Sequence, residues 1–150
     1  MLDAYAEIFE RMGSLHSDME QAIEGLPQEA LDWIAAPEIN SLSVLVTHTA
    51  GAERYWIGDV IGQDESGRVR EDEFHVKGIS AEKLIESLDE TLSHTRGVLA
   101  SLNLEDLEVV CTSPRDGHKF TVAWSLAHAL EHTALHLGHM QIIRQLWDQK

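Results

Sequence analysis

The stretch Trp124–His139 reads WSLAHALEHTALHLGH and lies within the longest helix pattern of the chain. Its apolar residues recur at intervals of three and four, which is typical of a helix with one buried face. Thr121 is a candidate N-cap, because a threonine hydroxyl can accept a hydrogen bond from a backbone N–H of the first turn. The pattern predicts a helix over about residues 121–148. Its apolar stripe contains Leu126, Ala129, Leu130, Thr133, Leu137, Met140 and Trp147.

Three further segments show the same periodicity, over about residues 2–24, 41–62 and 80–102. Pro27 follows the end of the first segment, Asn40 or Ser41 can cap the second, and Ser80 can cap the third. Four amphipathic helices of this length predict an all-α protein, a four-helix bundle. The whole chain, residues 1–150, fits a single domain of this kind.

The connections between these helices differ in character. Residues 63–73, QDESGRVREDE, are polar and charged. They predict a long surface loop, which implies a long crossover connection. Residues 28–40 carry no regular pattern. Residues 108–122 place two short strand-like runs around the turn residues 113–117, which predicts a short hairpin or irregular segment before the last helix.

Acidic residues dominate the charge, since 11 Lys and Arg stand against 26 Asp and Glu, a formal net charge of −15. Such a surface repels phosphate backbones and anionic lipid headgroups, so we expect no nucleic acid and no membrane among the partners. No apolar run approaches the roughly 20 residues of a membrane-spanning helix, and the N-terminus lacks a secretory pattern, so we expect a cytoplasmic protein. The single cysteine, Cys111, excludes an intramolecular disulfide and a multi-cysteine zinc site.

Histidines are concentrated in the last helix, where His128, His132, His136 and His139 are four of the nine in the chain. At about 100° per residue they lie at about 0°, 40°, 80° and 20° around the helix axis, on one narrow face. His132 and His136 lie closest to the apolar stripe, and two imidazoles four residues apart can bind one divalent cation. A third ligand must come from another helix, and His48 in the second helix is the natural candidate.

Structural explanations compete with these assignments. His48 alone is typical of a partly buried histidine. We expect His128 and His139, which lie further from the core, either to be solvated or to contact the metal-binding residues without binding the metal. The five residues from His128 to His132 also spell H-x-x-E-H, an inverted zinc-peptidase motif with a glutamate base. Glu131, however, lies toward the solvent side, so we do not favour this motif. The remaining histidines are isolated in the sequence, and we expect them at the surface: His16, His75, His94 and His118.

Two stretches of the chain resemble the DinB superfamily. Leu45–Trp56, LVTHTAGAERYW, is similar to its second-helix motif, in which a histidine precedes small residues and an acidic–aromatic stretch. Residues 116–144, which contain H-x-x-E-H-x-x-x-H-x-G-H from His128 onward, are similar to its fourth helix. The order and spacing of the helices fit over nearly the whole chain. The resemblance implies a DinB-like four-helix bundle of the up-up-down-down type, usually a homodimer, with a divalent metal ion in a cleft.

The resemblance also implies which residues bind that metal: His48 on the second helix, and His132 and His136 on the fourth. Some branches, including one similar to mycothiol-dependent maleylpyruvate isomerase, have glutamate at the position of His132, so this chain would have an all-histidine set. Many members have glutamine at the position of His139. This departure leaves a role beside the metal ligands open for His139, as the helix geometry does for His128. Either His128 or His139 could also supply a fourth ligand, which would close the site as in a structural zinc centre.

Three imidazoles leave coordination positions open, and a metal ion there can polarise a carbonyl or activate bound water. Zn, Ni and Fe(II) all accept such ligands. Members with assigned functions use low-molecular-weight thiols as cosubstrates. The resemblance thus implies a metal-dependent enzyme (a thiol-dependent transferase, an isomerase or a hydrolase) that acts on a small electrophile. Glu53 and Glu131 are candidate acids near the site. The alternatives are a non-catalytic metal-binding stress-response module and a metal-free dimeric helical protein that binds an apolar ligand.

Overall fold

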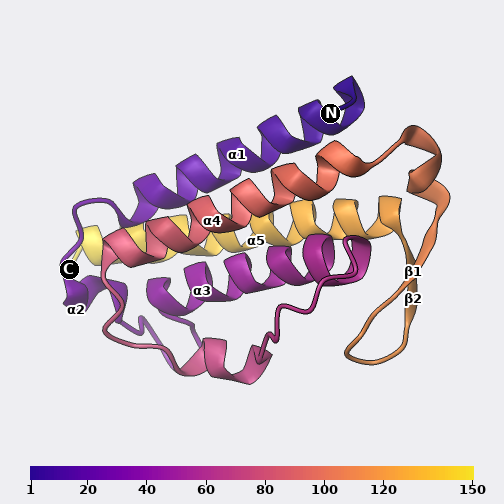
Figure 1. The fold of residues 1–150 in the computed structure, drawn as a ribbon. Coiled ribbons are helices and arrows are strands. Elements are labelled where there is room, and N and C mark those ends of the chain that lie inside the picture. The colour runs from indigo at the N-terminus through magenta and orange to yellow at the C-terminus, as the bar shows by residue number, and fades with distance from the viewer.

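Four long helices, α1 (Asp3–Ile23), α3 (Leu42–Glu53), α4 (Ala81–Ser101) and α5 (Val122–Asp148), lie side by side in a computed structural model that describes residues 1–150 (Figure 1). Shorter elements occupy the connections: helix α2 (Gln28–Leu31), the 3-10 helices η2 (Arg70–His75) and η3 (Leu104–Glu108), and the strands β1 (Val110–Thr112) and β2 (Lys119–Thr121). The predicted four-helix bundle with a short hairpin before the last helix is confirmed. None of the helices combines the length and the apolar character that crossing a membrane requires.

The order of helix directions differs from the expected one. In Figure 1, α1 and α5 run one way along the bundle, and α3 and α4 run the other way. The arrangement is therefore up-down-down-up, and the up-up-down-down expectation is wrong. The physical reason lies in the connections: residues 62–80 travel back along the bundle before α4 begins, so α3 and α4 are parallel. The segment between α1 and α3 turns at one end of the bundle, and the segment between α4 and α5 turns at the other end. Each of these segments therefore joins two antiparallel helices.

Side-chain caps begin three of the long helices where the sequence predicted them. The hydroxyl of Ser41 accepts a hydrogen bond from the backbone N–H of Val44. Ser80 caps α4 in the same way, and Thr121 caps α5 through the N–H of Trp124 at 3.1 Å. Each cap satisfies one of the backbone donors that the first helical turn leaves unpaired.

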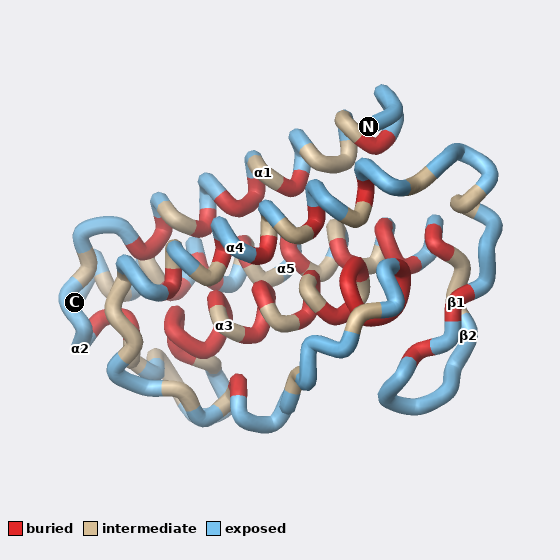
Figure 2. The backbone as a smooth tube through the Cα atoms, viewed as in Figure 1, coloured by how far each residue is buried: buried red, intermediate tan, exposed pale blue.

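Buried residues face the interior on all four long helices, as Figure 2 shows. One cluster lies among α1, α3, α4 and α5 around Met19, Leu42 and Met140. A second cluster, around Tyr5, Ile57 and Leu126, includes the hairpin residue Cys111. The hairpin pairs Cys111 with Phe120 in antiparallel register. Apolar burial along the whole length of the bundle holds the four helices in fixed register.

Two local structures depart from the sequence prediction. The second helix is α-helical only to Glu53 and continues as a π-helix, η1 (Arg54–Ile61). A periodicity of 3.6 residues cannot predict such a widened turn. The predicted loop 63–73 is exposed for most of its length but leads into η2, whose Glu73 is only 7% exposed. This crossover segment, residues 62–80, packs back onto α3.

Candidate metal centre

Three histidines from two neighbouring helices meet in the groove between α3 and α5. His48 comes from α3, and His132 and His136 come from successive turns of α5. One nitrogen of each ring lies within 4.8 Å of the other two. The Nε2 atom of His132 is 3.2 Å from the Nε2 atom of His48 and 3.2 Å from the Nε2 atom of His136. The structure thus brings together the three residues that the sequence singled out.

Two of the three separations within the donor set suit ligands that share one divalent cation. Neighbouring nitrogen ligands about 2.0–2.1 Å from an ion lie about 2.8–3.0 Å from each other in an octahedral arrangement and about 3.3–3.4 Å in a tetrahedral one, a range of about 2.8–3.4 Å. The two measured Nε2–Nε2 separations of 3.2 Å fall within this range. Imidazole is a common ligand for zinc, nickel and ferrous iron.

Burial keeps two of the three rings neutral and therefore able to coordinate. Desolvation, followed by the proximity of His136 and His48, lowers the pKa of His132 to about 3. Desolvation and the neighbouring His48 and His139 lower the pKa of His136 to about 4. At neutral pH both rings are uncharged, so each presents a nitrogen lone pair.

A buried carboxylate fixes the third ring. His48 Nδ1 lies 2.8 Å from Glu73 Oε2, and Arg68 Nη2 donates to the same oxygen at 2.8 Å. Burial alone would raise the pKa of Glu73, but the hydrogen bonds from Arg68 and His48 outweigh it and lower that pKa. An ionised carboxylate only accepts hydrogen bonds, so Nδ1 of His48 carries the proton. Its Nε2 is left free to coordinate, the arrangement that usually orients metal-binding histidines.

Sequence reasoning missed Glu73 and Arg68, because both lie in the stretch predicted to be a solvent-exposed loop. One signal was available: Phe74 is the only aromatic residue in residues 63–79. An aromatic residue in a charged stretch usually packs against something. In the structure the Phe74 ring lies 4.8 Å from the His48 ring, centroid to centroid, and docks η2 on α3.

The two outer histidines lie beside the cluster without joining it. His139 Nδ1 is 3.4 Å from His136 Nδ1, on an exposed side chain. His128 stacks on Trp124, with the rings 4.8 Å apart and inclined by 11°, and its centroid is 5.9 Å from that of His132. His132 is thus grouped with His136 and not with His128, and Glu131 is exposed, so the H-x-x-E-H pattern does not form a zinc-peptidase pair.

An aromatic wall flanks the His132 side of the cluster. Trp56 of η1 contacts Phe120, Trp124 and His128 edge-on, with centroid separations of 5.0, 5.2 and 4.8 Å. Phe120 in turn stacks on Trp124 at 4.3 Å. These rings come from η1, β2 and α5, so the hairpin and the π-helical turn contribute side chains next to the candidate site.

Two histidines that the sequence placed at the surface have carboxylate partners on other elements. His16 is 1% exposed, and its Nε2 lies 2.7 Å from Oε2 of Glu53. Thr95 Oγ1 donates to the other oxygen of that carboxylate at 2.7 Å. His94 is partly buried, with Nε2 2.7 Å from Asp64. The surface prediction was wrong for His16, because its partner lies on another helix, whereas the His94 side chain stays 28% exposed. Glu53, a predicted acid near the site, is instead committed to His16.

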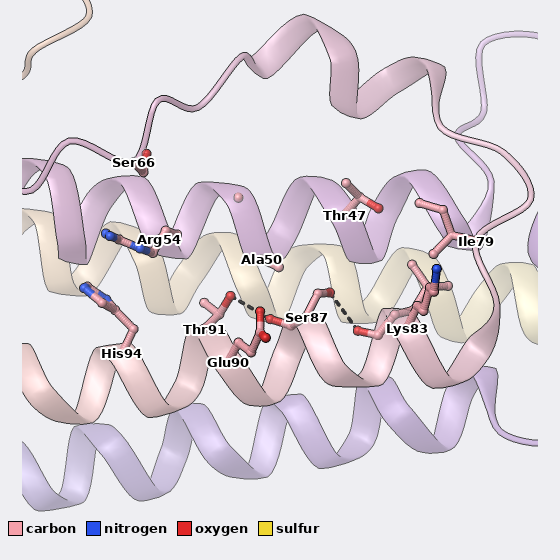
Figure 3. A pocket seen from close by; sticks show the side chains of 12 residues that line it. Thr47, Ala50, Arg54, Ser66, Ile79, Lys83, Ser87, Glu90, Thr91 and His94 are labelled. Carbon is pink, nitrogen blue, oxygen red and sulfur yellow. Dashed lines mark hydrogen bonds between the residues drawn. The ribbon is translucent and has the colours of Figure 1, made fainter.

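Two cavities lie close to these elements. The larger, about 540 Å³, is an open hollow lined by residues of α3, η1, α4 and the crossover segment, among them the polar side chains of Arg54, Glu90 and His94 (Figure 3). It contains none of the three clustered histidines. The smaller, about 390 Å³, lies between α3 and α5 and has His136 in its wall. Of these two cavities, only the smaller therefore borders the candidate metal centre.

Known proteins resemble this chain in sequence and in fold. A family model described as mycothiol-S-transferase matches residues 11–149. A conserved protein from Enterococcus faecalis superposes with a TM-score of 0.80 at 17% identity, and the match covers 100% of both chains. YfiT from Bacillus subtilis, described as a probable metal-dependent hydrolase with an unusual four-helix bundle topology, superposes with a TM-score of 0.77 at 13% identity, over 97% of this chain and 89% of YfiT. No curated protein matches the chain.

Proposed function

The chain belongs to the mycothiol-S-transferase family, within the DinB superfamily, and from this premise we propose that it is a metal-dependent enzyme that transfers a low-molecular-weight thiol to a small electrophile. Mycothiol is the first thiol to test, because the family carries its name. The observation that carries the proposal is the meeting of His48, His132 and His136 around one point.

The three histidines would hold the ion, which we propose to be Zn, Ni or Fe(II). A divalent ion bound there would lower the pKa of a bound thiol and polarise an electrophile. Glu73 holds the proton of His48 on Nδ1 and keeps its Nε2 turned to the cluster. Arg68 in turn holds Glu73 ionised. These residues position the ligands before any substrate arrives, so binding the ion requires little rearrangement.

The number of converging ligands favours a catalytic site over a structural one. Structural zinc sites are closed by four protein ligands, whereas catalytic sites have three and leave a position for water or substrate. Only three residues bring ligand atoms together here, and His128 and His139 stand outside that group. This arrangement is less suited to a non-catalytic metal-binding stress-response module, and a metal-free ligand-binding protein has no need of three converging imidazoles.

The test begins with elemental analysis of protein purified without a histidine tag or chelating resin. We expect about one divalent ion per chain, loss of the ion in His136→Ala, and retention in the control His118→Ala, whose histidine is exposed. The metal-loaded protein is then assayed for conjugation of mycothiol to neutral electrophiles. Unchanged metal content in His136→Ala would contradict the metal centre. Full metal content without thiol-dependent turnover would contradict the transferase.

Hydrolysis is a second candidate, since the structurally similar YfiT is described as a probable metal-dependent hydrolase. The same open site can bind water in place of a thiol. The two activities separate in one experiment: turnover of ester and amide substrates by the metal-loaded protein without any thiol favours the hydrolase. A strict requirement for the thiol favours the transferase.

Further properties follow from the resemblance and belong to the same proposal. We propose a single domain over residues 1–150, a cytoplasmic location, a small-molecule substrate and a homodimer. Sedimentation equilibrium of the metal-loaded protein tests the dimer directly. A monomeric species at micromolar concentration would contradict it.

A further inference from the structure

The cavity beside His136 has an aliphatic lining that the proposed chemistry does not explain. It measures about 390 Å³, within the usual range of small-ligand sites, and five of its nine lining residues are hydrophobic. Leu45 and Ile143 are buried at 3% exposure, whereas Ile39, Ile142 and Leu146 are 40–56% exposed. Exposed aliphatic residues that surround a hollow mark a place where an apolar group can bind.

The cavity lies next to the histidine cluster, along the same faces of α3 and α5. Leu45 lies three residues before His48 on α3, and Ile143 lies seven residues after His136 on α5. At these spacings the side chains share a helix face. His136 belongs to both places, with Nε2 in the cluster and its ring in the cavity wall. A molecule with its reacting atom at the cluster can therefore extend its remaining part along the groove into this cavity.

The charge around the cavity favours an uncharged occupant. Its polar lining consists of Glu38, Asn40, His136 and His139, with no lysine or arginine. A carboxylate placed among the aliphatic side chains, at the end of the cavity away from the histidines, would lose its hydration without gaining a cation. It would also lie near Glu38 in a chain of net charge −15. Glu38 itself has a φ of 67°, a left-handed conformation that non-glycine residues seldom adopt, so the cavity edge is held in a specific shape.

We propose that this cavity binds a neutral apolar portion of the electrophile, so that the enzyme acts on uncharged lipophilic substrates and discriminates against anionic ones. The proposal rests on the proposed function, because it takes the reacting atom to lie at the histidine cluster. The cavity is a property of the chain itself, so apolar binding can be measured with and without metal.

The experiment uses straight-chain methyl ketones, from butanone to 2-octanone, as unreactive neutral probes. Binding is followed by NMR chemical-shift titration of the metal-free and metal-loaded protein. We expect affinity to rise about two- to fourfold for each methylene group, the change expected when one such group is partly or fully buried. The shifts should centre on Leu45, Ile143 and His136. Alkanoates of equal length should bind the metal-free protein at least about tenfold more weakly than the ketones.

A matched pair of variants locates the binding. Ile142 and Leu135 are both on α5 and both 56% exposed, but only Ile142 lines the cavity. Ile142→Asn should weaken the longest ketone about fivefold or more and flatten the dependence on chain length, whereas Leu135→Asn should change neither. Glu38→Gln should improve alkanoate binding severalfold and leave ketone binding unchanged.

The outcomes separate this inference from the proposed function. A metal-loaded protein whose ketone affinity is independent of chain length, or equal in Ile142→Asn and Leu135→Asn, overturns the inference alone. A second result would also overturn it: the wild-type protein binds no ketone and sediments as a dimer, whereas Ile142→Asn sediments as a monomer. The aliphatic residues would then belong to an interface between two copies of the chain. Ketone binding by a protein that takes up no metal contradicts the proposed function and leaves an apolar-ligand site in this cavity.

Discussion

The Nδ1 atom of His48 lies 2.8 Å from Oε2 of Glu73, a residue 25 positions later in the chain and on a different element. This contact joins the crossover segment to the candidate metal centre. Arg68, which lies in the same segment, donates to both oxygens of Glu73. The orientation of one ligand on α3 therefore depends on the folding of a connection between helices. The first two predictions test this dependence.

Replacing Glu73 with alanine should weaken metal binding by about 10- to 100-fold, because the His48 ring loses the acceptor that fixes its orientation and protonation. The measurement is a competition titration against a chromophoric chelator. Glu71→Ala is the matched control, since that carboxylate lies on the same 3-10 helix and is 78% exposed. Equal affinities for the two variants would show that Glu73 has no part in metal binding.

Gly51→Ala should also weaken metal binding, although alanine favours a helix by about 1 kcal/mol over glycine. A Cβ atom at Gly51 would contact Oε1 of Glu73 and lie 3.2 Å from Nε of Arg68, so the carboxylate must move away from His48. The control is Gly97→Ala in α4, where a Cβ meets nothing within 4 Å. That variant should gain about 1 kcal/mol in urea unfolding and bind metal normally. Normal metal affinity in Gly51→Ala would contradict the steric argument.

The metal-free protein should lose stability as the pH falls from about 6.5 to about 4. An unfolded histidine has a pKa of about 6.5, whereas the folded values are about 3 for His132 and about 4 for His136. In this interval the unfolded chain binds more protons than the folded one, so the free energy of unfolding decreases with decreasing pH. The free energy of unfolding, measured with urea at several pH values, should decrease less steeply with falling pH in His132→Leu than in the wild type. His118→Leu, which removes an exposed histidine, should retain the wild-type slope.

His16→Leu should destabilise the protein by about 3–5 kcal/mol, because it leaves the carboxylate of Glu53 buried without its histidine partner. The double variant His16→Leu/Glu53→Leu should recover much of that loss, since replacement of a buried pair by apolar groups is often close to neutral. Urea unfolding of the single and double variants provides the test. Additive losses in the double variant would show that the pair is not coupled.

Most of the bundle was predictable because its signals are local. The caps Ser41, Ser80 and Thr121 and the 3.6-residue stripes depend on residues close together in sequence, and the structure has all three caps. His132 and His136 were predictable as a pair for the same reason, since one turn of α5 places them together. His48 could be singled out from its place on the second helix, but only the resemblance to the DinB superfamily implied it as a ligand, because no local pattern links it to α5.

The missed features depend on contacts between distant segments. His16 meets Glu53 and Thr95 from two other helices, and Glu73 meets His48 only after the crossover has returned along α3. The charge of Glu73 alone suggested a solvated residue, because its ion pair with Arg68 is apparent only in the three-dimensional structure. The direction of α4 could not be predicted for a similar reason, because nothing in residues 63–79 indicates how far they run along the bundle.

The exposed crossover segment contains Glu73 and Arg68, which together fix the orientation of His48. This arrangement has a kinetic consequence. A segment outside the packed interior opens at a lower free-energy cost than the bundle as a whole. Each opening would release the imidazole at position 48 to rotate while α5 keeps its own pair in place. Exchange of a bound ion with the medium would then proceed at the pace of this local opening. Because surface connections accept substitutions more readily than cores, the retention time of the ion can change in evolution while the four helices stay as they are.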